Sequence, residues 1–195
     1  MPRIIAGRLG GRTVPSPPTN RTRPTSDRVR EAVFSRLDSW GAVRGSTVLD
    51  LYAGTGALAF EALSRGAEFA VLVEAHRPTA KAIGEAARTL GLEESLRVEC
   101  GQASVGPRRE APFTLVCADP PYAVATEELA RLVTGLGAAG QLADEATIVL
   151  ERSARSEKTP LPSYFVDEGA RDFGDTRVEY FTYLDPAITE ASRQA

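Results

Sequence analysis

Residues that bind metals or form disulfides are scarce in this sequence. The 195 residues include two cysteines, Cys100 and Cys117, and a single histidine, His76. Because a zinc-type metal centre needs several such ligands at close spacing, we predict no metal site. Each cysteine lies at or near the end of an apolar segment, so we expect two buried thiols in a reducing compartment rather than a disulfide.

Long hydrophobic runs are also absent. No apolar stretch approaches the roughly 18 residues that indicate a transmembrane helix, and residues 1–7 lack the hydrophobic stretch of a signal peptide. The composition, with 43% hydrophobic and 25% charged residues, is that of a globular chain able to bury a core. We therefore expect one main domain in the cytoplasm, with a monomer as the default assembly.

Positive charge is concentrated near the beginning of the chain. Residues 1–44 contain nine arginines and three acidic residues, which gives +6, whereas residues 45–195 contain 14 basic and 23 acidic residues, which gives −9. Because a guanidinium can bind two phosphate oxygens at once, this segment indicates a contact with nucleic acid. A solvated, disordered tail is the alternative. The arginines predicted to make this contact are Arg3, Arg8, Arg12, Arg21, Arg23, Arg28 and Arg30. Arg28 and Arg30 could also face the cofactor cleft, and Arg28 fits an ordinary helix-surface charge as well.

Apolar segments of two kinds alternate from residue 46 onward. The pattern predicts strands near 47–51, 69–74, 96–100, 113–118 and 146–151, and helices near 57–65, 77–90 and 126–137. Such alternation is typical of an α/β fold, in which helices cover both faces of a mostly parallel sheet.

The two ends of the chain depart from this alternation. Strand candidates at 164–166 and 177–184, joined through Gly169 and Gly174, predict an antiparallel hairpin that closes the sheet. At the other end, a short hairpin around residues 4–14 and a helix over 26–37 are expected. We therefore divide the chain into a basic N-terminal extension (1–44), a main domain (45–185) and a flexible tail (186–195).

A glycine-containing segment follows the first predicted strand. Asp50 lies near the end of this strand, and Gly54 and Gly56 allow a sharp turn into the next helix, where the backbone can come close to a ligand. Glu74 ends the second strand, at a position suited to binding ribose hydroxyls. These residues fit a nucleoside cofactor, either NAD or S-adenosylmethionine. We favour S-adenosylmethionine because the Asp50 carboxylate would repel a pyrophosphate but attract an ammonium or sulfonium group.

The tetrapeptide Asp119-Pro120-Pro121-Tyr122 directly follows the strand predicted at 113–118. Prolines fix the backbone and donate no N–H, so the carbonyl oxygens around them are held still and can accept hydrogen bonds from a ligand. A carboxylate, fixed carbonyls and an aromatic ring suit a flat base that carries an exocyclic amine. A proline turn that only ends the strand is the alternative interpretation.

Taken together, the chain resembles the RsmD-type family of 16S ribosomal RNA (guanine-N2) methyltransferases. The resemblance covers nearly the full length. It rests on residues 3–7 with Gly11-Arg12, residues 23–31, residues 50–56 continuing into 62–66, and residues 119–122. It implies a Rossmann-like class I methyltransferase fold with seven strands, S-adenosylmethionine as methyl donor, and a guanine of the small-subunit RNA as acceptor.

Roles for individual residues follow from these patterns. Asp119, Pro120 and Tyr122 are expected to hold the guanine, with Asp119 acting as hydrogen-bond acceptor or as base. Many relatives carry an acidic residue after the third strand for the adenine amine, whereas Gln102 stands in this region here, so its side-chain carbonyl or backbone groups would bind the adenine. The residues expected to contact the cofactor are Asp50, Tyr52, Gly54, Gly56, Glu74, Gln102, Ala103 and Asp119.

Other functions stay open. An adenine-N6 methyltransferase acting on DNA or RNA would use the same acceptors, and a non-catalytic RNA-binding assembly factor could share the fold. An NAD-dependent oxidoreductase fits the glycine segment, but the sequence offers it no obvious Tyr-x-x-x-Lys motif or histidine acid.

Overall fold

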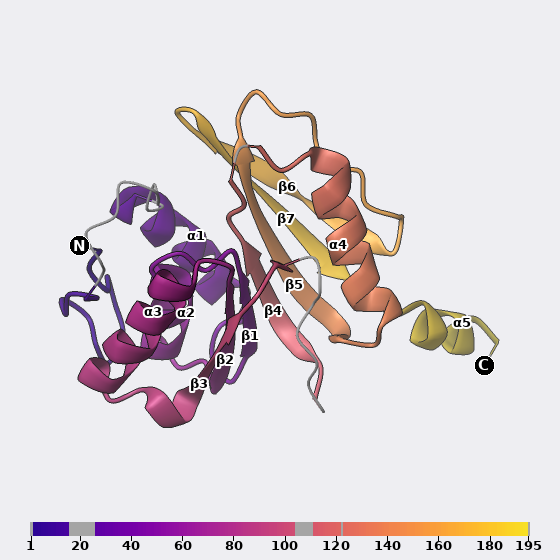
Figure 1. Cartoon of the computed structure of the whole chain (residues 1–195). Coiled ribbons are helices and arrows are strands. Elements are labelled where there is room, and N and C mark those ends of the chain that lie inside the picture. The colour runs from indigo at the N-terminus through magenta and orange to yellow at the C-terminus, as the bar shows by residue number, and fades with distance from the viewer. Residues whose placement is uncertain (1, 16–25, 104–110, 122, 195) are drawn as a thin grey trace.

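The computed structural model describes residues 2–15, 26–103, 111–121 and 123–194 (Figure 1). Its elements, in chain order, are α1 (Asp27–Ser39), β1 (Thr47–Leu51), α2 (Ala57–Ser64), β2 (Phe69–Glu74), α3 (Arg77–Leu90), the 3-10 turn η1 (Glu93–Ser95), β3 (Leu96–Cys100), β4 (Phe113–Ala118), α4 (Thr126–Ala138), β5 (Leu142–Ser153), β6 (Phe165–Phe173), β7 (Thr176–Tyr183) and α5 (Pro186–Gln194).

The strands form one seven-stranded sheet in the order β3-β2-β1-β4-β5-β7-β6. The first five are mutually parallel, and β7 runs antiparallel to both β5 and β6. Apolar side chains fill both faces of the sheet. One cluster joins α1, α2 and α3 to one face, and a second cluster joins α4 to the other. Figure 1 shows the same division, with α1 to α3 together and α4 across the sheet from them. The predicted α/β fold is therefore confirmed.

Most element bounds agree with the sequence pattern, and β5 is the main difference. Its predicted core, 146–151, lies within an observed strand that begins at Leu142. The pairing of β4 with β5 shifts register between Phe113 and Leu115, and Glu145 has a positive φ of 62°. This irregularity brings the polar residues before Ala146 into the strand, although their side chains do not alternate as in a regular strand.

The C-terminal hairpin is confirmed, but its two glycines play different parts. Gly174, with a φ of 62°, lies in the turn between β6 and β7. Gly169, with a φ of 92°, lies inside β6, where pairing shifts between Asp167 and Ala170. It therefore marks a bulge rather than the turn.

Residues 2–15 form a closed loop rather than a regular hairpin. A single antiparallel bridge joins Arg3 to Thr13, and the buried side chains of Ile4, Leu9 and Val14 attach the loop to the main core. Gly7 has a φ of 81°, and a Cβ there would lie 2.0 Å from the backbone oxygen of Ser64. Only glycine allows the loop to approach α2 this closely.

The segment expected to be a flexible tail is helical from Pro186 to Gln194. None of the helices in the described ranges is long and apolar enough to cross a membrane.

Candidate functional site

The predicted site residues gather at the carboxyl ends of the parallel strands. The N–H of Ala53, just after β1, donates to the oxygen of Val73 on β2 at 3.0 Å, and the N–H of Asp119, just after β4, approaches the oxygen of Leu51 at 3.4 Å. The loops after β1, β2 and β4 therefore meet at one edge of the sheet. Ligands of open α/β sheets bind at this edge.

The loop between β1 and α2 has an unusual backbone. Tyr52, Gly54 and Gly56 all have positive φ, at 59°, 55° and 76°. A side chain at Gly56 would also meet the ring of Phe60 at 2.9 Å, so the glycine is required by both conformation and space. Tyr52 is a non-glycine residue in the left-handed region, which costs energy and marks this loop as a site where a particular shape is maintained.

Glu74 holds the loop in this shape. One carboxylate oxygen accepts a 2.9 Å hydrogen bond from the N–H of Gly54, and the other accepts a 2.7 Å hydrogen bond from the N–H of His76. Each oxygen has two lone pairs, so each can still accept one hydrogen bond from a hydroxyl group. The prediction that Glu74 binds ribose hydroxyls is compatible with this geometry, and the carboxylate has a structural role besides.

Asp50 is almost fully buried, with 1% of its surface exposed. One carboxylate oxygen accepts from the N–H of Ala59 at 3.1 Å and so fixes the first turn of α2. Burial raises the pKa of Asp50 well above the usual range of an aspartate; the hydrogen bond from Ala59 opposes this, and the charges of Asp119 and Glu74 add to it. Asp119 and Glu74 thus lie close enough to Asp50 for their charges to act on it, and an edge with three carboxyl groups favours a cationic ligand.

Asp119 is half-buried and Pro120 is buried, directly beyond the end of β4. The oxygen of Pro121 accepts a 2.9 Å hydrogen bond from the N–H of Val124, which closes a tight turn there. Tyr122, predicted to stack on the base, lies outside the described residues. The part of the tetrapeptide that is described therefore lies beside the glycine loop, as the sequence predicts.

Arg152, near the end of β5, lies close to the tetrapeptide; its position at the end of the predicted fifth strand indicates a place near the cleft and a structural salt bridge. Its side chain is buried, and Nη2 donates to the oxygen of Val124 and to the hydroxyl of Thr126, both at 3.1 Å. These bonds tie the segment after the tetrapeptide to the sheet. Burial and the charge of Glu128 raise the pKa of Tyr52, while Arg152 lowers it, which places Tyr52 near the same segment. The sequence predicts no hydrogen bonds from Arg152 to the segment after the tetrapeptide, because these partners lie more than 20 residues away along the chain.

The residues after β3 are placed differently from one another. Ala103 is buried, and Gln102 is exposed, so any contact between Gln102 and an adenine stays a prediction.

Cys117 is buried as expected, and burial raises the pKa of its thiol. Cys100, in contrast, is exposed, because β3 is an edge strand that leaves its last residue uncovered.

The arginines fall into three groups. Arg3, Arg8, Arg12 and Arg28 are exposed and able to contact RNA. Arg8 lies at the last residue of α2, where its N–H donates to Ser64 at 2.8 Å, and so about 12 Å along the helix from the glycine loop. Arg21 and Arg23 lie outside the described residues.

Arg30 forms the third group and corrects the sequence prediction. It is 1% exposed, and its guanidinium donates to the backbone oxygen of Arg3 and to Asp27. A buried guanidinium with these partners cannot bind a phosphate in this conformation. Arg30 instead joins α1 to the N-terminal loop.

Glu61, a residue that the sequence analysis missed, completes this junction. It is fully buried on α2 and accepts hydrogen bonds from the N–H groups of Ile5 and Ala6 at 2.7 and 3.1 Å, and from Arg65. The signal that could have revealed it is a lone acidic residue inside the apolar helix 57–64. This carboxylate connects the arginine-bearing loop to the helix that follows the glycine loop.

The sheet with its reversed last strand, the glycine loop after β1 and the acidic residues beside it define a Rossmann-like methyltransferase. A sequence profile of the family described as "Conserved hypothetical protein 95" matches residues 2–182, and the chain belongs to this family, the RsmD family.

Individual relatives agree with this assignment. Ribosomal RNA small subunit methyltransferase D of Escherichia coli is 34% identical over 161 residues, which cover 83% of this chain and 79% of that one. The protein of the same name from Haemophilus influenzae is 35% identical over 124 residues, 62% of this chain and 63% of the other. Among solved structures, the yhhF protein of Escherichia coli superposes with a TM-score of 0.81 at 31% identity, over 94% of this chain and 98% of that chain. An RNA methyltransferase from Salinibacter ruber, solved with S-adenosyl-L-homocysteine, shares the fold with a TM-score of 0.62 at 16% identity, over 83% and 94% of the two chains.

Proposed function

We propose that this chain transfers a methyl group from S-adenosylmethionine to the exocyclic N2 of a guanine in 16S ribosomal RNA of the small subunit. One observation carries the proposal: β1 and β4 are neighbours in the sheet, and the N–H of Asp119, at the start of the acceptor tetrapeptide, lies 3.4 Å from the oxygen of Leu51 at the start of the glycine loop. A base held by Asp119 would therefore lie next to a nucleoside held by the loop. The names of the relatives, which are ribosomal RNA small subunit methyltransferases, support the same substrate.

The residues at this edge fit S-adenosylmethionine better than NAD. The donor carries a sulfonium and an ammonium group, and three neighbouring carboxylates would attract both, whereas they would repel a pyrophosphate. Glu74 keeps acceptor sites for the ribose hydroxyls, and the positive φ angles of Gly54 and Gly56 shape the turn beside it. When bound, the cofactor supplies a methyl group on a positively charged sulfur. The structure of the Salinibacter ruber enzyme with S-adenosyl-L-homocysteine supports such binding by this fold.

The acceptor residues would make the guanine amine reactive. The lone pair of N2 is delocalised into the ring, so hydrogen-bond acceptors that draw its two hydrogens reduce this delocalisation. The Asp119 carboxylate and the Pro120 carbonyl would serve as these acceptors, and Tyr122 would stack on the base. Most of the acceleration then comes from positioning and from charges arranged in advance. Asp119 would also take the proton if any side chain does.

The RNA contact is expected to depend on shape more than on sequence. A paired base must leave its helix to reach the site, at a cost of about a few kcal/mol, so an unpaired or looped-out guanine is the expected target. The exposed Arg3, Arg12 and Arg28 would bind flanking phosphates. The small extension around the catalytic fold leaves most of the recognition to a shape assembled by the ribosomal particle.

Mass analysis of the RNA product tests this function. The protein is incubated with labelled S-adenosylmethionine and small ribosomal subunits from cells that lack the enzyme, with naked 16S RNA and with DNA, and nucleosides are then separated. We expect N2-methylguanosine from the ribosomal substrate. N6-methyladenosine would replace the proposal with the adenine enzyme, and no methyl transfer under conditions where the protein binds RNA would favour the assembly factor.

A ligand-binding assay tests the cofactor separately. S-adenosylhomocysteine at 100 times its Kd should stabilise the protein by about 2.7 kcal/mol, seen as a higher melting temperature, whereas NADH should not. Stabilisation by NADH alone would overturn the choice of cofactor.

A further inference from the structure

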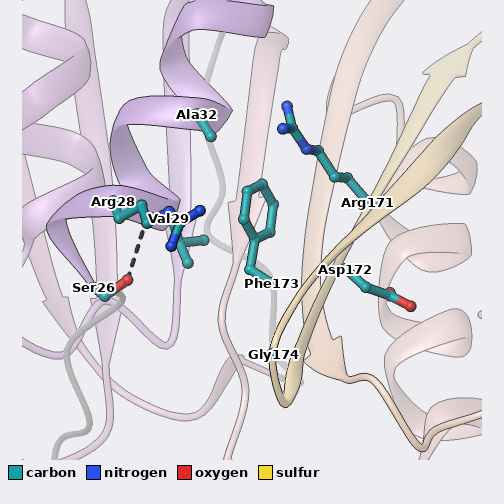
Figure 2. Close-up of a pocket in the computed structure, with 8 residues that line it drawn as sticks. All are labelled: Ser26, Arg28, Val29, Ala32, Arg171, Asp172, Phe173 and Gly174. Carbon is teal, nitrogen blue, oxygen red and sulfur yellow. Dashed lines mark hydrogen bonds between the residues drawn. The ribbon is translucent and has the colours of Figure 1, made fainter.

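A groove separates α1 from the tip of the β6–β7 hairpin, outside the site described above. Two adjoining hollows, of about 480 and 570 Å³, share Arg28, Ala32 and Arg171 in their walls and so form one continuous groove. Figure 2 shows the hollow next to the hairpin tip, with Arg28 on α1, Arg171 on β6 and the ring of Phe173 between them. We call it the α1–β6 groove.

Near the hairpin tip the walls of this groove carry Arg28, Arg171 and one acidic residue, Asp172, while Arg36 and Glu31 line the farther hollow. Arg28 and Arg171 are exposed, and no salt bridge or side-chain hydrogen bond joins either guanidinium to another of the described residues. The acidic residue at this end, Asp172, is held by Arg177 at 2.8 Å and points away from the groove (Figure 2). An anionic ligand would therefore meet two available guanidinium groups here.

Phe173 and Arg36 give the groove a firm shape. The Arg171 guanidinium lies 5.1 Å from the centre of the Phe173 ring, and Phe173 itself packs against the main core. Farther along α1, the Arg36 guanidinium lies over the rings of both Trp40 and Tyr180 and donates to the oxygen of Glu168. Side chains held in this way lose little freedom when a ligand binds.

The groove opens at the edge of the sheet where the candidate active site lies. Ala118 pairs with Leu150, Leu150 with Glu179 and Glu179 with Ala170, so Asp119 and Arg171 stand at the same level of the sheet. Three strand spacings separate β4 from β6, which is about 14 Å. The first turn of α1, which carries Arg28, lies at this same edge opposite Gly174.

We propose that the α1–β6 groove binds the sugar–phosphate backbone of single-stranded RNA next to the target nucleotide. This inference rests on the proposed function, and it adds Arg171 and Phe173 to the RNA-binding surface. Two guanidinium groups on opposite walls bind phosphates, and the apolar floor of Val29, Ala32 and Phe173 lies beneath the sugars. The separation of about 14 Å suits a strand that continues from a base held at Asp119 to phosphates beside Arg171.

A binding experiment tests the groove. Arg28→Gln, Arg171→Gln and the double variant are titrated with a fluorescein-labelled single-stranded RNA at several salt concentrations, in the presence of excess S-adenosylhomocysteine. Arg131→Gln is the control, because Arg131 is equally exposed but lies on α4, across the sheet. We expect the double variant to bind on the order of tenfold more weakly, with a salt slope about 1.4 smaller in magnitude, since each lost contact to a single strand removes about 0.7.

The outcomes separate the groove from the proposed function. If the double variant matches Arg131→Gln in RNA affinity and in salt slope, the groove does not bind RNA, even when the wild-type protein methylates its substrate. If the double variant binds free RNA normally but loses activity on assembled subunits, the groove contacts a ribosomal protein, and the RNA proposal is wrong. A wild-type protein that binds no RNA would contradict the proposed function itself.

Discussion

The carboxylate of Glu61 on α2 accepts a 2.7 Å hydrogen bond from the backbone N–H of Ile5, and this contact fastens the arginine-bearing loop to the methyltransferase domain. The same carboxylate accepts from Arg65 at 2.7 Å and lies 3.8 Å from the buried guanidinium of Arg30. Folding of the domain and placement of the arginine-bearing loop are therefore coupled through one side chain.

Replacing Glu61 should disrupt the contact between α2, Arg30 of α1 and the N-terminal loop. In Glu61→Ala, Arg30 loses a buried partner and two backbone N–H groups lose their acceptor, so we expect a loss of about 3–5 kcal/mol in the free energy of unfolding. Chemical denaturation measures the change. Glu68→Ala, at an exposed position, should stay within about 0.5 kcal/mol of the wild type. Equal effects of the two substitutions would show that Glu61 is not a structural anchor.

The buried Asp50 carboxylate is expected to lower the free energy of unfolding at neutral pH, although it helps to bind the cofactor. Its pKa in the folded state is raised, chiefly by burial, so the folded protein holds more protons than the unfolded chain as pH rises above the ordinary aspartate pKa of about 3.9. The free energy of unfolding therefore falls as the pH rises from the ordinary aspartate pKa to the raised pKa of folded Asp50, because the buried carboxyl group must ionise. Asp50→Asn should lack this fall and be more stable than the wild type at neutral pH.

The same variant should bind the cofactor product less well. Loss of one charged partner costs about 2 kcal/mol, or roughly thirtyfold in the Kd for S-adenosylhomocysteine measured by calorimetry. Glu94→Gln, at an exposed position remote from the loop, controls for charge and should change neither property. An Asp50→Asn protein with wild-type affinity would mean that the acidic edge does not select a cation.

Asp119→Asn should impair the chemical step. The amide keeps one acceptor oxygen but presents a donor where the guanine amine needs an acceptor, so kcat/KM for methyl transfer to small subunits should fall by about 10²–10³-fold. Single-turnover transfer of a tritiated methyl group measures it. Glu85→Gln on α3 should transfer methyl at the wild-type rate. Undiminished transfer by Asp119→Asn would remove Asp119 from the mechanism.

Arg152→Gln should displace the segment after the tetrapeptide and so act on catalysis only through the position of the acceptor residues. The change removes the two 3.1 Å hydrogen bonds to Val124 and Thr126, and displacement of the segment by about 1 Å is expected to reduce kcat by up to about 100-fold. Arg155→Gln, an exposed neighbour, is the matched control. A purely structural effect would lower the melting temperature yet leave kcat unchanged at temperatures where the variant is folded, and this result would exclude a positioning role.

The order and type of the elements could be read from the sequence because local residue patterns determine them. The apolar runs at 47–51, 69–74, 96–100 and 113–118 give strands with those same bounds. Gly56 and Asp119 could be predicted as site residues because a glycine or a carboxylate directly after an apolar strand is visible in the sequence. Contacts between distant segments leave no such mark, so the sequence predicts neither the role of Glu61 nor the hydrogen-bond partners of Arg152.

The sequence by itself determined the parallel sheet, the glycine turn and the concentration of arginine near the beginning of the chain, since each depends on residues close together along the chain. Tertiary structure decided which charges face solvent: it buried Arg30 beneath the N-terminal loop and brought Arg171 to a groove opposite Arg28. Burial depends on what packs against a side chain, and such partners can lie far apart along the chain, as Ile5 and Glu61 do at a separation of 56 residues.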